Sequence, residues 1–272
     1  MDSHLKFIEI DSTPSTNTLL TSMAADVEHG TVVLAREQNA GRGQRGNTWE
    51  AEPGKNITMS MLLKPVHIHP KYMHLISEII SLSIIKVLRR YIEPSCGMVS
   101  IKWPNDIYVD NKKICGILVE NAIMSDRIAH SGVGIGLNVN QREFRSDAPN
   151  PVSMCLLTGK VLSVDELARE LCAEIMLNMS ECLADEAIIN QTHALYQKNL
   201  WRKRAITCMQ PPTVAVSKLA FWLLRRPECS LSRRKTACVA TSHLRKWRQC
   251  SVELNCKNSI KKVFGIVSCH KK

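Results

Sequence analysis

The segment Gly41-Arg42-Gly43-Gln44-Arg45-Gly46-Asn47-Thr48-Trp49 combines three glycines with two arginines. Glycine lets the backbone approach a ligand closely and adopt positive φ angles. Arginine carries a planar guanidinium group that suits phosphate or carboxylate oxygens. We therefore interpret residues 41–49, here called the clamp, as a loop that closes over a small, negatively charged molecule.

The spacing of these glycines also matches the Gly-x-Gly-x-x-Gly fingerprint of dinucleotide-binding folds. That fingerprint requires a helix starting at the last glycine and an acidic residue about 20 positions later. Residues 47–56 instead resemble a loop, and Ile57–Leu63 resembles a strand. A dinucleotide site is therefore disfavoured, while a glycine-rich surface hairpin without a ligand stays an alternative.

Length and composition are those of an ordinary globular protein, with 272 residues and 44% hydrophobic residues. No apolar run reaches the ~20 residues of a membrane-spanning helix, and the N-terminus does not resemble a signal peptide. We therefore expect a cytoplasmic protein that makes no membrane contact. Its 11 cysteines should be mostly free thiols, and none forms a Cys-x-x-Cys pair that would indicate structural zinc.

Polar residues follow the first predicted strand, Phe7–Ile10. A turn at Asp11–Pro14 leads to Ser15-Thr16-Asn17 and then to a helix whose apolar positions continue to Val27. Ser15 or Thr16 could serve simply as the helix N-cap. The three polar side chains could equally hydrogen-bond a neutral ligand at this strand-to-helix turn.

Lys102 lies at the end of a strand that should be buried, just before the turn Trp103-Pro104-Asn105-Asp106. An unpaired ammonium is costly to bury, so a lysine in this position needs an anion. The anion could be a ligand, or a carboxylate such as Glu120.

Two hydrophobic strands are predicted next, at Ile114–Glu120 and at residues 128–139. The second contains Gly132, Gly134 and Gly136 at alternate positions, which leaves one face of the strand bare. A flat molecule could lie against that face.

Six motifs of this chain occur in the order found in biotin protein ligases, and the sequence resembles that family over roughly residues 5–200. The clamp and Lys102-Trp103-Pro104-Asn105-Asp106 are the most specific of them. The other four are Ser15-Thr16-Asn17, Gln38, Gly116-Ile117-Leu118-Val119-Glu120 and Gly134-Ile135-Gly136-Leu137-Asn138. Lipoate ligases share the fold but have different signatures.

The resemblance implies an α+β fold with a mixed, largely antiparallel central sheet flanked by helices, as in biotin–lipoate ligases and class II aminoacyl-tRNA synthetases. It also implies a two-step reaction. Biotin and ATP, with Mg²⁺ as cofactor, form biotinyl-5′-adenylate and pyrophosphate. A lysine of a biotin carboxyl carrier protein then attacks the adenylate. No covalent enzyme intermediate is expected, so catalysis depends on positioning two anions and stabilising charge on the α-phosphate.

The resemblance gives Lys102 a place between the biotin carboxylate and the α-phosphate, and gives Arg42 a role in binding the adenylate. Asp106 would hold Lys102 or Mg²⁺. The remaining predicted ligand contacts are Ser15, Thr16, Asn17 and Gln38 at the biotin head group, Gly116 and Leu118 along its chain, Asn138 near the nucleotide, Asn105 in the same site, and Gly41, Gly43, Gln44 and Arg45 in the clamp.

Two departures from the family pattern stand out. Gln44 occupies a position where some members carry a second arginine, and a neutral amide there would weaken retention of the adenylate unless Arg45 compensates. Many members also carry an N-terminal helix-turn-helix, whereas Phe7–Ile10 already fits the catalytic domain here. We therefore expect a ligase and not a repressor, with DNA binding disfavoured and a homodimer allowed.

The formal net charge of +11 is concentrated in the last quarter of the chain. Residues 201–272 contain 17 Lys and Arg against 2 Asp and Glu, whereas residues 1–200 contain 19 against 23. We therefore divide the chain into a catalytic domain, residues 1–201, and a basic, cysteine-rich tail, residues 202–272, in place of the family's small β-barrel.

Three explanations of this tail stay open. Its basic runs with Trp222 and Trp247 could bind nucleic acid. It could be an unusual folded cap, although only Lys262–Val267 resembles a strand. A shifted reading frame from about residue 202–205 fits best, because Arg, Cys, Ser and Trp become frequent while Asp and Glu almost vanish; such a tail would be poorly ordered.

Overall fold

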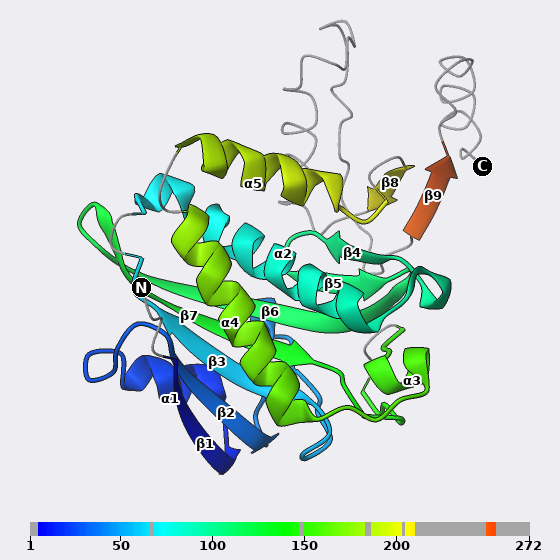
Figure 1. Ribbon diagram of the computed structural model, residues 1–272, viewed down its shortest axis with the longest axis horizontal. Helices are drawn as coiled ribbons and strands as arrows, with labels where there is room; N and C mark the ends of the chain where they lie inside the picture. Colours follow the sequence, from blue (N-terminus) through cyan, green and yellow to red (C-terminus); the bar gives the residue numbers. More distant parts are fainter. Residues whose placement is uncertain are drawn as a thin grey trace, which may run out of the picture. The chain divides into compact units, whose positions relative to one another are not determined.

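The computed structural model describes residues 5–65, 68–146, 150–182, 186–202, 205–209 and 249–253. The chain divides into two compact units, residues 1–201 and residues 202–272. In the first unit a central sheet is flanked by helices (Figure 1). In the second, β8 (Ala205–Met209) and β9 (Gln249–Glu253) form an antiparallel pair. The strand predicted at Lys262–Val267 lies outside the described residues.

The sheet of the first unit has seven strands in the order β1-β2-β3-β7-β6-β5-β4. β1 and β2 run parallel, and each other neighbouring pair is antiparallel. This arrangement confirms the predicted mixed, largely antiparallel sheet. The strands are β1 (Lys6–Thr13), β2 (Thr31–Gln38), β3 (Ile57–Leu63), β4 (Val99–Lys102), β5 (Asp106–Val109), β6 (Lys112–Met124) and β7 (Arg127–Leu137).

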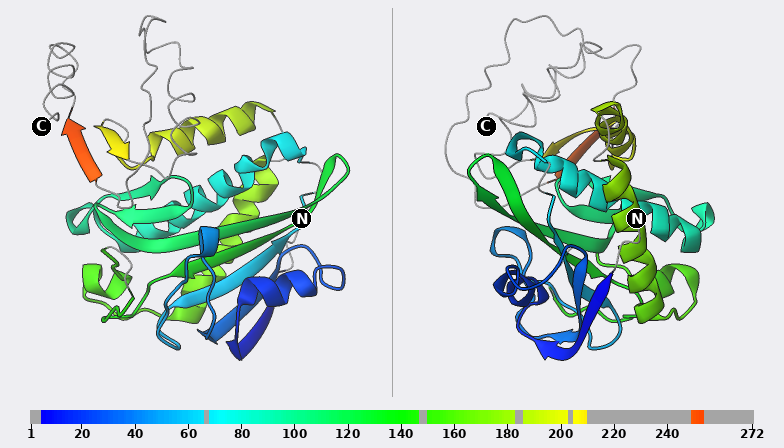
Figure 2. Two further views of the ribbon diagram at one scale, coloured as in Figure 1. Left: turned by 180° about the vertical axis from the view of Figure 1, so that it is seen from behind. Right: turned by 60° about the vertical axis from the view of Figure 1, so that its left-hand side comes forward.

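Two long helices, α2 (His74–Tyr91) and α4 (Val164–Cys182), lie together over one face of the sheet (Figures 1 and 2). The apolar stripe of α2 is fully buried there, as its helical periodicity predicts. α5 (Glu186–Lys198) packs on α2. The shorter helical segments are η1 (Gln44–Gly46), η2 (Pro70–Tyr72), η3 (Pro94–Cys96) and α3 (Met154–Thr158).

The opposite face of the sheet is covered in part by α1 (Thr16–Ser22), whose Leu20 packs with Val33 and Leu62 in a separate small apolar cluster. Side chains of a strand alternate between the two faces, and residues paired across strands share a face. The pairs Gly116–Gly136, Leu118–Gly134 and Glu120–Gly132 of β6 and β7 therefore lie in three successive rows on one face. Each row contains at least one glycine, which leaves space above the sheet.

Two local predictions were wrong. The turn expected at Asp11–Pro14 is largely strand, because β1 continues to Thr13 by pairing with Gln38 at the end of β2. The helix expected to reach Val27 ends at Ser22. Its later apolar residues still pack on the α1 cluster from a series of turns, so the apolar pattern reports burial there and not helix length.

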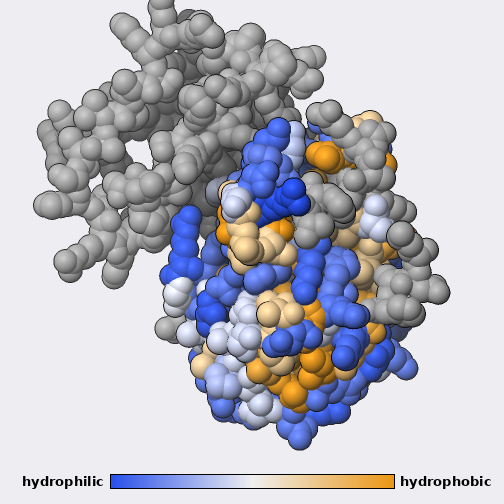
Figure 3. All heavy atoms as spheres, turned by 90° about the vertical axis from the view of Figure 1, so that its left-hand side faces the viewer, coloured by the Kyte–Doolittle hydropathy of each residue, from blue (hydrophilic) through white to orange (hydrophobic). Residues whose placement is uncertain are grey.

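Figure 3 shows the left-hand side of the molecule in Figure 1, where hydrophilic and hydrophobic side chains are mixed. At the tip of the β6–β7 hairpin, Ile123 and Met124 are exposed. In the described part of the chain, none of the helices is long and apolar enough to cross a membrane.

The packing of α2 makes a stability prediction. Ile84 is fully buried (0% exposed) in the main core, whereas Leu177 of α4 is 50% exposed. We expect Ile84→Ala to lower the free energy of unfolding by about 2–5 kcal/mol, because it leaves a cavity. The matched change Leu177→Ala should stay within about 0.5 kcal/mol of the parent protein. Denaturant unfolding followed by circular dichroism measures both, and equal effects would contradict this packing.

Candidate functional site

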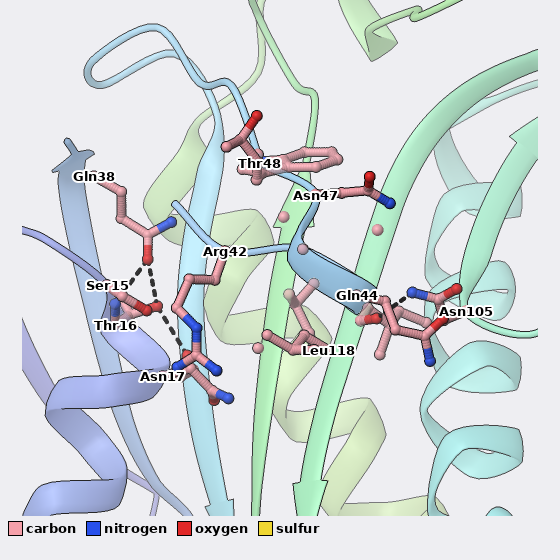
Figure 4. Close-up of a pocket in the computed structure, with 18 of the residues that line it drawn as sticks. Ser15, Thr16, Asn17, Gln38, Arg42, Gln44, Asn47, Thr48, Asn105 and Leu118 are labelled. Atoms are coloured by element: carbon pink, nitrogen blue, oxygen red, sulfur yellow. Dashed lines mark hydrogen bonds between the residues drawn. The ribbon is translucent and has the colours of Figure 1, made fainter. Parts of the chain in front are cut away.

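A cavity of about 250 Å³ lies on the glycine-bearing face of the sheet, between the start of α1, the clamp and strands β3, β6 and β7 (Figure 4). A second hollow of about 440 Å³ shares the clamp and Leu118 with it. Of the predicted site residues, the first cavity is lined by Ser15, Thr16, Asn17, Gln38, Arg42, Gly43, Gln44, Arg45, Asn105, Asp106, Gly116 and Leu118. Gly41 lines the second hollow.

A polar network forms one end of the cavity. The backbone N–H and the hydroxyl of Thr16 donate to Gln38 Oε1 at 2.7 and 2.9 Å, and the Thr16 hydroxyl lies 2.8 Å from Ser60 Oγ. Figure 4 shows the side chain of Gln38, the last residue of β2, turned toward Thr16. Because Gln38 Oε1 accepts both hydrogen bonds, its Nε2 is the atom that can donate to a neutral ligand.

The N-cap interpretation of the strand-to-helix turn is confirmed, while its contact with a ligand stays a prediction. Ser15 is the N-cap of α1, and its Oγ accepts a hydrogen bond from Thr18 N at 3.4 Å. The same residue is buried and lines the cavity with Thr16 and Asn17. A helix start that exposes N–H groups and side-chain oxygens to a hollow can therefore serve the fold and a ligand at once.

The clamp is a short hairpin with a tight tip. Gly43 N donates to Asn47 O and Trp49 N donates to Gly41 O, at 2.7 and 3.0 Å. A side chain on Gly41 would place its Cβ 2.5 Å from Trp49 O, so glycine is needed for this close approach. At the tip, Arg45 adopts the left-handed conformation (φ 58°, ψ 36°), which costs an ordinary residue roughly 1 kcal/mol or more.

The flat group that lies against the glycine face is the indole of Trp49. A Cβ on Gly136 would lie 2.3 Å from Trp49 Cε2, and one on Gly116 would lie 3.1 Å from Trp49 Cζ3. The bare surface predicted from the glycines is thus shared: Trp49 covers the row Gly116–Gly136, and the cavity lies over Gly134. The indole N–H is buried without a hydrogen-bond partner among the described residues.

Glu50 connects the clamp to residues 145–146. Its carboxylate accepts hydrogen bonds from the backbone N–H groups of Arg145 and Ser146, at 2.9 and 2.6 Å. Burial alone would raise the pKa of Glu50, but the hydrogen bonds from Ser146 and Arg145 hold it below its usual value. The end of the clamp is therefore fixed to the segment that follows β7.

Arg42 forms an ion pair with Glu120 through Nη2, and its Nη1 donates to Thr18 Oγ1 at 2.9 Å. The other oxygen of Glu120 accepts from Asn17 Nδ2 at 2.6 Å. Glu120 is therefore occupied by Arg42 and Asn17, and the alternative in which it neutralises Lys102 is wrong.

Lys113 is a cavity residue that the sequence interpretation missed. Its Nζ lies 2.7 Å from Asp106 Oδ1, and both residues line the cavity. Lys113 precedes the strand expected at Ile114–Glu120, yet it belongs to β6, where the register against β5 shifts between Ile107 and Tyr108. Because of this β-bulge, the consecutive residues Ile114 and Cys115 are both buried and Lys113 shares a face with Gly116. Strict alternation would have predicted the opposite face.

Lys102 lies on the same face of the sheet but is not among the described residues that line either hollow. Its Nζ is 2.9 Å from Tyr108 Oη and 5.7 Å from the centre of the Trp201 ring. Its predicted contact with a carboxylate and a phosphate stays a prediction.

Two asparagines predicted near the ligand have structural partners. Asn105 lines the cavity, and its Nδ2 donates to Ile117 O at 2.8 Å. Asn138 directly follows the last residue of β7. It lies outside the described cavity lining, and its Nδ2 donates to Val152 O at 3.1 Å. The place of Asn138 near a nucleotide therefore stays a prediction.

Among solved structures, the biotin protein ligase from Aquifex aeolicus in complex with biotin and ATP resembles this chain, with a TM-score of 0.66 and 24% sequence identity. The similarity covers 76% of this chain and 83% of that one. The two proteins therefore share a fold, which is the catalytic fold of biotin protein ligases.

Residues 9–140 match the biotin/lipoate A/B protein ligase family. The bifunctional ligase/repressor BirA of Bacillus spizizenii is 37% identical over 144 residues, which are 52% of this chain and 42% of that protein. The biotin--[acetyl-CoA-carboxylase] ligase of Paracoccus denitrificans is 32% identical over 158 residues, 57% of this chain and 65% of that protein. Residues 9–140 are therefore similar to the biotin/lipoate A/B protein ligase family, and the similarity to the Bacillus relative spans less than half of that protein.

The contact between Trp49 and Gly136 can be tested by a double-mutant cycle. We expect Gly136→Ala to lower the free energy of unfolding by about 1–3 kcal/mol, because the new methyl group overlaps the indole. In a Trp49→Ala background the same change should cost much less. Chemical denaturation of the four proteins measures this coupling, and an equal loss in both backgrounds would contradict the placement of the indole.

Proposed function

We propose that this chain activates biotin with ATP and transfers it to a carrier protein. In the first step an oxygen of the biotin carboxylate attacks the α-phosphorus of ATP. A new O–P bond forms, the bond to the bridging oxygen breaks, and pyrophosphate leaves. In the second step the amine of a carrier lysine attacks the acyl carbon, AMP leaves with the bonding electrons, and the amine releases a proton.

The observation that supports this proposal most strongly is the composition of the cavity. A neutral hydrogen-bonding end, built from Thr16, Gln38 and Ser60, suits the uncharged head group of biotin. Lys113 and Arg42 line other parts of the same cavity and suit a carboxylate and a phosphate. A ligand with one neutral polar end and one anionic end matches this arrangement.

The proposed reaction needs positioning and charge stabilisation but no enzyme nucleophile, and the properties of the described cysteines agree with this. Cys96, Cys115, Cys155 and Cys172 are free thiols, as expected from the sequence. Burial raises the pKa of the Cys172 thiol to about 12 and also raises the pKa of Cys115. Both therefore stay protonated at neutral pH, and neither is a suitable nucleophile.

Mg²⁺ would enter the site with ATP and help to neutralise its phosphates. Among the described residues there is no group of three His, Cys, Asp or Glu side chains that could hold a metal. Mg²⁺ usually binds substrate phosphates and one or two carboxylates. Asp106 is the one carboxylate in the described lining of the first cavity, and it fits that pattern. In this structure it is paired with Lys113.

The acceptor we propose is a biotin carboxyl carrier domain of a carboxylase. The name of the Paracoccus relative, a biotin--[acetyl-CoA-carboxylase] ligase, supports this choice. A reaction that consumes ATP and modifies such an enzyme would take place in the cytoplasm.

The decisive experiment is biotin-dependent exchange of labelled pyrophosphate into ATP by the full-length chain. We expect exchange that requires biotin, because the first step is reversible and needs no carrier. Exchange supported by lipoate and not by biotin would identify a lipoate-type ligase instead. Absence of exchange with either acid would refute adenylate formation.

Two lysines allow a matched comparison of roles. Lys113 lines the cavity, whereas Lys102 lies nearby on the same sheet face against Tyr108. We expect Lys113→Ala to reduce exchange by roughly 100-fold or more, the scale of a lost group that stabilises transition-state charge. Lys102→Ala tests the role predicted from the motif: abolished exchange supports it, and an undiminished rate would show that Lys102 does not touch the reacting groups.

We further propose that the sequence beyond about residue 204 is translated from a shifted reading frame. The loss of Asp and Glu from this segment supports the proposal. A strand-rich continuation in another frame of the gene would confirm it, and the lack of one would refute it.

A further inference from the structure

We propose that Glu120 is a positioning residue of this site, because its carboxylate ties the clamp to the first turn of α1. The inference rests on the proposed function for its catalytic consequence. The geometry that motivates it stands independently of which ligand binds.

Glu120 occupies the third row of the glycine face, next to Gly132. Its Oε1 pairs with the Arg42 guanidinium, and its Oε2 accepts from Asn17 Nδ2 at 2.6 Å. Arg42 belongs to the clamp and Asn17 to α1, so two segments far apart in sequence meet on one side chain. Both partners line the cavity.

The charge of Glu120 fixes the orientation of the Asn17 amide. An ionised carboxylate has no hydrogen to donate, so the amide must turn its Nδ2 toward Glu120. Asn17 is 2% exposed, and its Oδ1 has no hydrogen-bond partner among the described residues. A buried amide held with one unsatisfied oxygen indicates that the contact with Glu120 determines how this side chain lies.

Gly132 makes the arrangement sterically possible. A Cβ at that position would lie 2.8 Å from Thr21 Cγ2 and 3.2 Å from Asn17 Oδ1. The start of α1 therefore sits directly on the sheet beside Glu120. Arg42 also reaches Thr18 Oγ1 on the same helix, at 2.9 Å. Glu120 therefore determines how far the clamp lies from the end of the cavity that Thr16 and Gln38 form.

The first test needs no ligand. Glutamine at position 120 keeps the shape but removes the charge that pairs with Arg42, and its amide NH2 finds an acceptor on Asn17 only if the Asn17 side chain turns its Oδ1 toward it. Loosening of the clamp exposes the bonds after Arg42 and Arg45 to trypsin. We expect Glu120→Gln in the full-length chain to be cleaved there about three- to tenfold faster, as mass spectrometry of the released peptides would measure.

Glu9→Gln is the matched control. Glu9 forms a partly exposed ion pair with Arg169 at 2.5 Å, on strand β1 and away from the cavity. It should leave cleavage within the clamp unchanged. Equal rates for the parent protein and Glu120→Gln, or equal acceleration by Glu9→Gln, would overturn the proposal.

The second test measures the consequence for the proposed reaction. For pyrophosphate exchange we expect Glu120→Gln to raise KM for biotin about tenfold, equivalent to ~1.4 kcal/mol, with little change in kcat. Glu120→Asp should restore part of the affinity because it keeps both acceptors. Combining Glu120→Gln with Asn17→Ala should add little to the effect of Asn17→Ala alone.

The two tests separate failure of this inference from failure of the proposed function. A fall in kcat at unchanged KM would show that Glu120 acts on the reacting groups and would overturn a positioning role. If the parent protein performs no exchange while trypsin still distinguishes Glu120→Gln from Glu9→Gln, the proposed function fails and the structural role of Glu120 stands.

Discussion

The structure depends on a steric constraint at the pairing of β6 with β7. Each of three successive rows on one sheet face contains at least one glycine, so side chains from other segments can reach the backbone there. Trp49 occupies the first row, the cavity lies over the second, and Asn17 lies beside the third. The opposite face of the same strands is packed against α2 and α4 in a continuous core. One sheet therefore provides a rigid support on one side and a place for a ligand on the other.

Two cations of the cavity, Arg42 and Lys113, are already paired with carboxylates of the same chain. Arg42 binds Glu120, and Lys113 binds Asp106. These ion pairs are partly exposed, so each is worth little by itself and can be exchanged for a better partner. An entering carboxylate or phosphate would thus meet positive groups that are held in place yet remain available. This arrangement spares the protein from unpaired charge at a partly buried site.

The mixed sheet and most residues of the cavity lining were predicted through the resemblance of six motifs to biotin protein ligases. The residues of Ile57–Leu63 indicated a strand, and glycine spacing identified the bare face of β7. Two features depended on contacts between distant segments. Trp49 was known only as the last clamp residue, and nothing in its neighbourhood indicated that its indole would lie on Gly136. Lys113 was hidden because the β-bulge beside it breaks the alternation from which faces are predicted.

Because of the bulge in β6, an insertion or deletion has different consequences at the start of this strand and at the turn that follows it. At the exposed turn around Ser125, an added or lost residue would alter a loop and little else. Between Lys112 and Gly116, loss of one residue would restore regular alternation and direct the Lys113 ammonium into the apolar layer beneath α2. Homologous chains that differ in length should therefore accommodate the difference at the hairpin tip, while the count of residues before the first glycine of β6 stays constant.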